Sequence, residues 1–198
     1  MVSHTPAECD ERWRVGDRVY VPRVTGYALL LRGINVGGHK KVPMAGLRAL
    51  LESLGYADVR TYLQSGNAVV TTDEPAATVA KRCEAAIADA FGMDVRCLVL
   101  AGPELREIAD AHPLRDVADN GSRMTALFLL DPAPPGAADP VGLDPRHIRV
   151  ADRVIYQWCP EGISNAPDVA AFVRKSWKVA VTGRNWNTVE KLLALLDA

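Results

Sequence analysis

The hydrophobic and polar positions of residues 26–101 predict a regular succession of strands and amphipathic helices. An apolar run at 27–31 is typical of a buried strand, and apolar residues at helical spacing predict a helix that starts near Pro43 and ends at Gly55. Further along we expect strands at 59–63 and 68–72 around a hairpin turn at 64–67, a helix at 76–91 and a strand at 95–100. This β-α-β-β-α-β order is that of a ferredoxin-like lobe.

The second half of the chain predicts a weaker copy of the same order. Five prolines between residues 131 and 145 indicate that its first crossover helix is short, distorted or missing. We expect a later helix to begin at residue 165 or 166, with Pro167 in its first turn. The remaining expected elements are strands at 125–130, 146–150, 154–158 and 178–182 and a final helix at 187–196. No sequence repeat relates the halves, so their similarity rests on element order alone.

These elements predict an α+β fold of two ferredoxin-like (βαββαβ) halves, the alpha-beta plait, with an added C-terminal helix. We expect the first lobe at 26–101 and the second, with the C-terminal helix, at 123–198, joined by a connecting helix and loop at 102–122. Residues 1–25 mix charged and turn-forming residues without a sustained period, which indicates a loosely attached extension.

Composition limits the classes of function. The 198 residues are 48% hydrophobic, enough for a packed core, and 23 basic against 24 acidic residues exclude nucleic-acid binding by bulk charge. The N-terminus has acidic residues where a signal peptide needs an apolar core, and no apolar run reaches the length of a membrane span. We therefore expect a cytoplasmic protein without a membrane partner.

Cysteine and histidine spacing does not predict a metal or redox site. The four cysteines are at least 14 positions apart, and the four histidines are equally scattered. Cys83 and Cys97 fall on an apolar helix stripe and in an apolar strand, where free cysteine packs as a small hydrophobic residue. We expect no disulfide framework, no bound metal and no cofactor.

The first candidate motif is the glycine-rich loop at 32–41, which follows the first strand. Glycines allow close approach of the backbone to a ligand, and residues 27–51 contain no acidic side chain. The spacing matches neither a Walker loop nor GxGxxG. An ordinary strand-to-helix loop with a solvated basic tip is the alternative. The candidate ligand-binding residues of this loop are Arg32, Gly33, Asn35, Gly37, Gly38, Lys40 and Lys41.

The second motif is the segment Thr-Tyr-Leu-Gln-Ser-Gly-Asn at 61–67. Ser65 and Asn67 are first of all residues that supply tight-turn geometry in a hairpin. A nucleophilic serine needs an adjacent base, and no His or Lys lies nearby in the sequence. We therefore interpret Tyr62, Ser65 and Asn67 as candidate hydrogen-bonding groups rather than as a catalytic set.

The third motif is the segment Thr-Gly-Arg-Asn-Trp-Asn-Thr at 182–188. Asn187 with Glu190 three positions later matches a helix capping box, which accounts for both without a ligand. Arg184, Asn185 and Trp186 are then left as candidate ligand-binding residues, because an arginine beside a helix N-terminus suits a phosphate or carboxylate. A solvated basic surface is the alternative.

Together the three motifs resemble the bacterial family called domain of unknown function 1697 (DUF1697). The family pattern of LLRGINVGG, TYxQSGN and RNWNT is matched at 30–38, 61–67 and 184–188. The resemblance implies a two-lobed ferredoxin-like architecture and supplies no activity or catalytic residues. Three departures are Gly183 where the family often has threonine, the proline-rich segment, and the 25-residue extension. An alternative start at Val24 would explain the extension, and N-terminal sequencing of the native protein would test it.

We expect the first loop and the Arg184 segment to meet between the lobes and to bind a small phosphorylated or carboxylated ligand, nucleotides included. Two alternatives stay open: RNA binding on a ferredoxin-like sheet, which the lack of an aromatic at 68–72 disfavours, and a non-catalytic protein-interaction module. No set of base, nucleophile and orienting group names a reaction, so the sequence leaves open whether the protein is an enzyme. It does not indicate an oligomeric state either.

Overall fold

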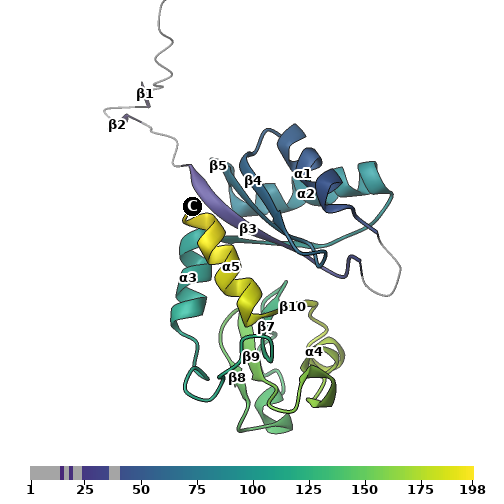
Figure 1. The fold of residues 1–198 in the computed structure, drawn as a ribbon, viewed down its shortest axis with the longest axis vertical. Helices are drawn as coiled ribbons and strands as arrows, with labels where there is room; N and C mark the ends of the chain where they lie inside the picture. The colour runs from purple at the N-terminus through teal and green to yellow at the C-terminus, as the bar shows by residue number, and fades with distance from the viewer. Residues whose placement is uncertain (1–13, 16–17, 20–23, 36–40) are drawn as a thin grey trace, which may run out of the picture.

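The computed structural model describes residues 14–15, 18–19, 24–35 and 41–198. Within these residues the chain is α+β, with two four-stranded antiparallel sheets and five α-helices (Figure 1). A further two-stranded ladder pairs β1 (Arg14–Val15) with β2 (Arg18–Val19). None of the described helices is long and apolar enough to cross a membrane.

The first sheet has the strand order β4-β5-β3-β6 and carries two helices on one face. Its strands are β3 (Thr25–Leu31), β4 (Ala57–Tyr62), β5 (Asn67–Thr72) and β6 (Cys97–Ala101), and its helices are α1 (Met44–Ser53) and α2 (Ala76–Phe91). We call this sheet with α1 and α2 the first lobe. All the elements predicted for it are present, and α2 has the predicted bounds.

The second sheet has the strand order β10-β7-β9-β8. When the strands of each sheet are numbered along the chain and read from the edge that holds the last strand, both orders are 4-1-3-2. Its strands are β7 (Met124–Leu129), β8 (Ile148–Val150), β9 (Val154–Trp158) and β10 (Val181–Asn185), and its outer face packs on α4 (Val169–Ser176). We call these elements the second lobe. Where the first lobe has α1, this one has only the 3-10 turn η1 (Pro140–Leu143), so the prediction of a short, distorted or missing helix in the proline-rich segment is confirmed.

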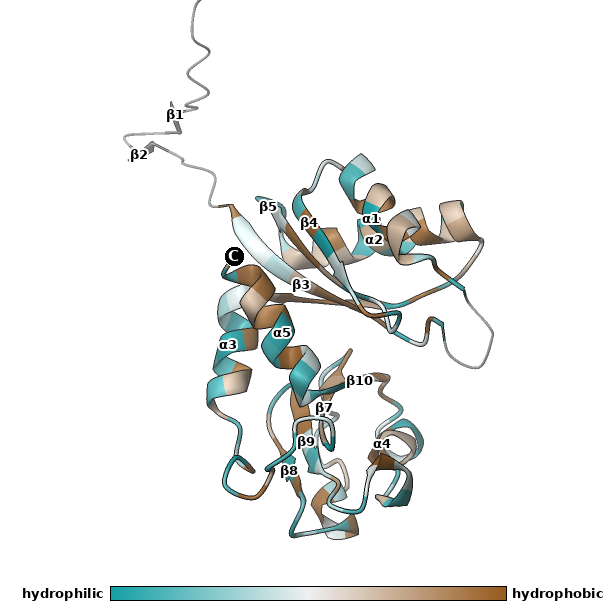
Figure 2. Cartoon of the chain, in the orientation of Figure 1, coloured by the Kyte–Doolittle hydropathy of each residue, from teal (hydrophilic) through white to brown (hydrophobic). Residues whose placement is uncertain are grey.

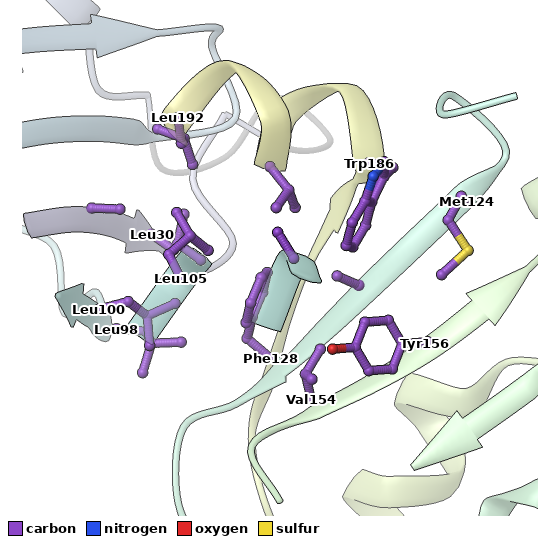
Figure 3. Packing of buried hydrophobic residues seen from close by; sticks show 14 of the residues in the cluster. Leu30, Leu98, Leu100, Leu105, Met124, Phe128, Val154, Tyr156, Trp186 and Leu192 are labelled. Carbon is purple, nitrogen blue, oxygen red and sulfur yellow. The ribbon is translucent and has the colours of Figure 1, made fainter. Parts of the chain in front are cut away.

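Two helices, α3 (Gly102–Asp110) and α5 (Trp186–Leu196), lie between the sheets and are packed together (Figure 1). Hydrophobic and hydrophilic residues alternate along both, as expected for helices that bury one face (Figure 2). One continuous core joins both sheets to these helices, including Leu30, Leu98, Leu100, Leu105, Phe128, Tyr156, Trp186 and Leu192 (Figure 3). The lobes are therefore held together by a shared hydrophobic layer.

Several predicted boundaries differ from those of the structure, and three of the differences have a local cause. The helix expected from residue 165 or 166 begins at Val169, because the Asp168 side chain accepts a hydrogen bond from Ala171 N (2.8 Å) and caps it there. The strand expected at 178–182 is β10, three residues later, since Lys178 takes a left-handed conformation (φ 58°) that interrupts an extended chain. Asn67 belongs to β5 rather than to the hairpin turn, because it pairs with Tyr62.

The capping box at the start of α5 was also wrong. Asn185 is the N-cap: its Oδ1 accepts from Thr188 N (3.0 Å) and from Thr188 Oγ1 (2.7 Å). We therefore expect Asn185→Ala to lower the free energy of unfolding by about 1 kcal/mol, and Asn187→Ala by only a few tenths. Urea denaturation of both variants measures the difference, and a larger loss for Asn187→Ala would contradict the assignment.

Candidate functional site

All three sequence motifs meet at the junction of the two lobes. β3 ends at Leu31, the β4–β5 turn follows Tyr62, and β10 brings Arg184 from the second lobe to both. Arg184 is only 7% exposed, although it carries a charge. The sequence thus places chemistry-bearing residues at three distant positions that the fold brings into contact.

Each of the five N–H groups of Arg184 has an acceptor within the protein. Nε donates to Asn67 Oδ1, and the acceptors of the terminal nitrogens are Thr182 Oγ1 (2.9 Å), Gly183 O (2.8 Å), Leu31 O (2.9 Å), Ser65 O (3.1 Å) and Gly66 O (3.2 Å). Four of these six acceptors belong to the first lobe. The side chain therefore fastens β10 to the end of β3 and to the β4–β5 turn.

The charge of Arg184 is not balanced by an acid in contact with it. Its six acceptors are all neutral oxygens. Burial lowers the pKa of Arg184 to about 10, so the guanidinium is still protonated at neutral pH. A positive charge in a poorly solvated position raises the local potential and favours an anion at the adjacent surface.

Asn67 is the first-lobe partner of Arg184 and is fully buried (0% exposed). Its Nδ2 donates to Tyr62 O (2.9 Å) and to Ser65 Oγ (3.0 Å), while its Oδ1 accepts from Arg184. The amide thus fixes the β4–β5 turn internally. Ser65 Oγ accepts from Asn67, so its hydroxyl hydrogen is still available to donate to another group. Ser65 is exposed, so that group can belong to a ligand.

Arg32 also spans the junction, on the surface side. Its Nε donates to Val181 O (3.1 Å) in β10, and the residue is half-buried. Its terminal Nη groups have no partner within the described part of the chain. The bond to Val181 orients the guanidinium plane, and it leaves the two Nη groups available for an end-on contact with a carboxylate or phosphate.

Asn35 links Val42 to the β4–β5 turn. Its Oδ1 accepts from Val42 N (2.9 Å), and its Nδ2 donates to Val42 O (3.0 Å) and to Gln64 O (2.7 Å). Asn35 and Val42 are thereby held to each other and to the β4–β5 turn. Gly33 turns the chain out of β3 with a positive φ of 67°.

The other predicted residues divide into three groups. Lys41 is exposed and Tyr62 half-buried on the first lobe, while Gly37, Gly38 and Lys40 lie outside the described residues. Asn185 caps α5, and Trp186 packs in the central core, away from Arg184's contacts. Sequence reasoning missed Thr182 and Val181 as polar partners. Thr182 lies inside the third motif, whereas Val181 contributes a backbone carbonyl that no side-chain pattern reveals.

Within the described ranges there is no group of three or more His, Cys, Asp or Glu side chains that could hold a metal ion. The described cysteines Cys83, Cys97 and Cys159 are buried free thiols.

Comparison with known proteins gives a family but no activity. A family model described as "Protein of unknown function (DUF1697)" matches residues 24–156, a range that includes the first two motifs. Among solved structures, the chain is similar to the conserved bacterial protein SP0830 from Streptococcus pneumoniae, with 26% sequence identity and a TM-score of 0.63. That match covers 87% of this chain and 99% of the other. No curated protein matches the chain.

Proposed function

The chain belongs to the DUF1697 family of proteins of unknown function, and we propose that it binds a small anion at the junction of its two lobes. The ligand class is a phosphorylated or carboxylated small molecule, nucleotides included. Arg32 is the residue that carries the proposal, because its terminal nitrogens are unpaired in the described chain while its Nε is fixed to β10.

In this proposal Arg184 acts as a positioning residue rather than as a ligand contact. All of its N–H groups already have protein acceptors, so it has no donor to offer. Arg184 nevertheless lies close to Arg32, because it donates to the carbonyl of the preceding residue, Leu31. Its uncompensated positive charge therefore raises the electrostatic potential beside Arg32. Ser65 and Lys41 would complete the site with a hydroxyl donor and an exposed ammonium group.

We also infer that residues 26–101 and 123–198 are two ferredoxin-like lobes joined through 102–122. In chain order, both sheets have the sequence 4-1-3-2 with antiparallel neighbours, and the first lobe has both crossover helices. The second lobe has lost one of them to η1. This inference supports the location of the ligand, since pairs of lobes commonly bind ligands between them.

RNA binding by base stacking on the first sheet is less well supported. The face toward α1 and α2 and the face toward α3 and α5 both contribute to buried clusters. Stacking of bases on strand aromatics needs an open sheet face, and both faces here are covered by helices.

Arg32→Ala tests the anion site directly. Inorganic phosphate, nucleoside monophosphates and di- and tricarboxylates are titrated by calorimetry, and at least one is expected to bind the wild type. Loss of a charge-assisted pair of hydrogen bonds weakens that binding by about 10- to 100-fold, corresponding to roughly 1.5–3 kcal/mol. Thermal unfolding of the variant is expected to stay close to wild type, because Arg32 contributes a single bond to the fold.

Arg48→Ala is the matched control, since Arg48 is an exposed arginine of α1 in the same lobe. It removes one positive charge without touching the junction and is expected to change the affinity less than about twofold. Equal losses in the two variants would show that only net charge matters. The absence of binding by every anion in the panel would overturn the proposal.

A further inference from the structure

A second candidate site lies at the opposite end of the third motif, in a cavity of about 440 Å³. It is bounded by the end of α3, the connecting segment 111–121 and the first turn of α5. His112 and Trp186 line it together with Asn187 and Glu190. Its volume falls within the range of sites that hold small organic ligands. The anion site uses none of these four residues.

His112 presents a hydrogen-bond donor in the cavity lining. The residue is 7% exposed, and its ring stacks parallel to Tyr156 (centroids 5.4 Å apart) and packs against Trp186 (4.2 Å). Its Nδ1 accepts from Leu114 N (3.2 Å), which assigns the hydrogen of the neutral ring to Nε2. Burial, and then the charge of Arg115, lower the pKa of His112, so the ring is neutral at neutral pH.

Trp186 presents a second donor. It is 9% exposed, and Figure 3 shows it beside Tyr156 under the start of α5. Neither Trp186 Nε1 nor His112 Nε2 has an acceptor within the described residues. The one fully enclosed side-chain N or O atom without a partner there is Thr125 Oγ1, so both ring N–H groups keep some accessible surface, and both residues line the cavity. Donors of this kind need an acceptor, which water supplies when no ligand is bound and a ligand oxygen would supply in its place.

The rim of the cavity carries carboxylates, which accept hydrogen bonds, whereas the two rings of the lining donate them. Asp110, Asp119 and Glu190 are exposed carboxylates without an ion pair among the described residues, whereas Arg115 donates to the carbonyls at the end of α3. Three carboxylates against one guanidinium make the rim negative, so it repels phosphates and carboxylates. The cavity therefore selects against the ligand class proposed for the anion site.

A ligand in this cavity has to accept hydrogen bonds from the ring N–H groups of the lining and must not be repelled by the carboxylates of the rim. An ammonium group donates to carboxylates but cannot accept from the two ring N–H groups, and an anion accepts but is repelled. A hydroxyl group does both at once, since its oxygen accepts and its hydrogen donates. The side chain of Asn187, which has no hydrogen bond within the described chain, adds one donor and one acceptor group.

We propose that this cavity binds a polyhydroxylated small molecule of the saccharide class, uncharged or positively charged. Trp186 Nε1 and His112 Nε2 donate to its oxygens, and the carboxylates of Asp119 and Glu190 accept from its hydroxyl groups. The proposal is independent of the anion site and accounts for the two residues of the third motif, Trp186 and Asn187, that the anion site leaves unused.

The indole N–H resonances of the full-length protein provide the test. The sequence has four tryptophans, and Trp177 Nε1 donates to Ala138 O (2.7 Å), which makes its resonance an internal control. Titration with neutral hexoses and pentoses, amino sugars and free nucleosides is expected to shift the Trp186 resonance and to leave that of Trp177 in place. Trp186→Phe assigns the peak. Two negative controls are included. Putrescine is a cation without hydroxyl groups, and inorganic phosphate is an anion that the rim carboxylates repel.

Two variants then tie binding to the cavity. Glu190→Gln removes one rim carboxylate, and His112→Phe keeps the ring stacking but removes Nε2–H; each is expected to weaken saccharide binding at least fivefold. Asp116→Asn, on the exposed part of the same connecting segment, is expected to leave it unchanged. No shift with any saccharide, an equal response to putrescine, or insensitivity to both Glu190→Gln and His112→Phe would overturn the proposal. Arg32→Ala is expected to have no effect.

Discussion

Arg184→Ala is expected to destabilise the protein by about 3–5 kcal/mol and to lower its Tm by roughly 10 °C. The substitution removes six hydrogen bonds at once and leaves Asn67 Oδ1 and the Leu31 carbonyl in a buried position without this donor, whereas the Gly66 carbonyl keeps its bond from Leu31 N. Each unsatisfied buried group costs about 1–3 kcal/mol, although relaxation and entering water reduce the sum.

Urea unfolding followed by tryptophan fluorescence and by circular dichroism measures this effect. Arg184→Lys is expected to recover only a small part of the loss, because an ammonium group cannot reach acceptors spread around a planar guanidinium. Arg174→Ala, at an exposed position of α4, is the matched control and is expected to change stability by less than about 0.5 kcal/mol. Wild-type stability of Arg184→Ala would show that the side chain does not hold the lobes together.

Gly66→Ala is expected to cost about 3 kcal/mol, from two separate causes. The residue has a φ of 81°, which strains any side chain, and its carbonyl accepts from Leu31 N (2.8 Å). An added Cβ would lie 2.7 Å from Ile34 Cδ1 and 2.9 Å from Leu31 Cβ, closer than packed carbon atoms approach. The turn, the end of β3 and Ile34 would therefore have to move apart, and with them the acceptors of Arg184.

Gly55→Ala separates the two causes. Gly55 has a φ of 84°, but a Cβ there meets nothing within 4 Å, so the variant is expected to lose only the backbone strain of about 1–2 kcal/mol. Ile34→Val removes the methyl group nearest to the new Cβ, so it should restore part of the stability of Gly66→Ala. Equal losses for Gly55→Ala and Gly66→Ala in denaturant unfolding would argue against the close approach at Gly66.

The distinction between the two arginines matters for any functional experiment. Loss of ligand binding in Arg184→Ala has a structural explanation, since that variant disturbs the turn and the end of β3. Arg32 contributes one hydrogen bond to the fold and has unpaired Nη groups in the described chain. Binding experiments therefore rest on Arg32→Ala, and stability experiments on Arg184→Ala.

The first lobe could be predicted from sequence because its elements carry local signals. The helical spacing of Val79, Cys83 and Ile87 and the glycine that follows the helix define α2 without reference to the rest of the protein. The prolines before Arg146 likewise predict the missing helix, because proline lacks the N–H that a helix interior requires.

The start of α5 could not be predicted in this way. Asn185 and Asn187 both suit a cap, and Glu190 favours the second by spacing. In the structure β10 extends through Asn185, and Trp186 packs in the central core, so the N-cap lies two residues before the one that the capping-box pattern indicates. Burial of an indole outweighs a capping contribution of about 1 kcal/mol.

Local pattern thus determined the element order, the α+β class, the missing helix in the proline-rich segment and the three motifs, because hydrophobic periodicity and turn residues act over a few neighbouring positions. Tertiary structure decided what the motifs do. Arg184 and Arg32 are both basic residues beside glycine in the sequence, yet one lies among six protein acceptors and the other keeps its Nη groups unpaired in the described chain. Four of the acceptors of Arg184 come from residues more than 100 positions away, and such contacts leave no mark on local pattern.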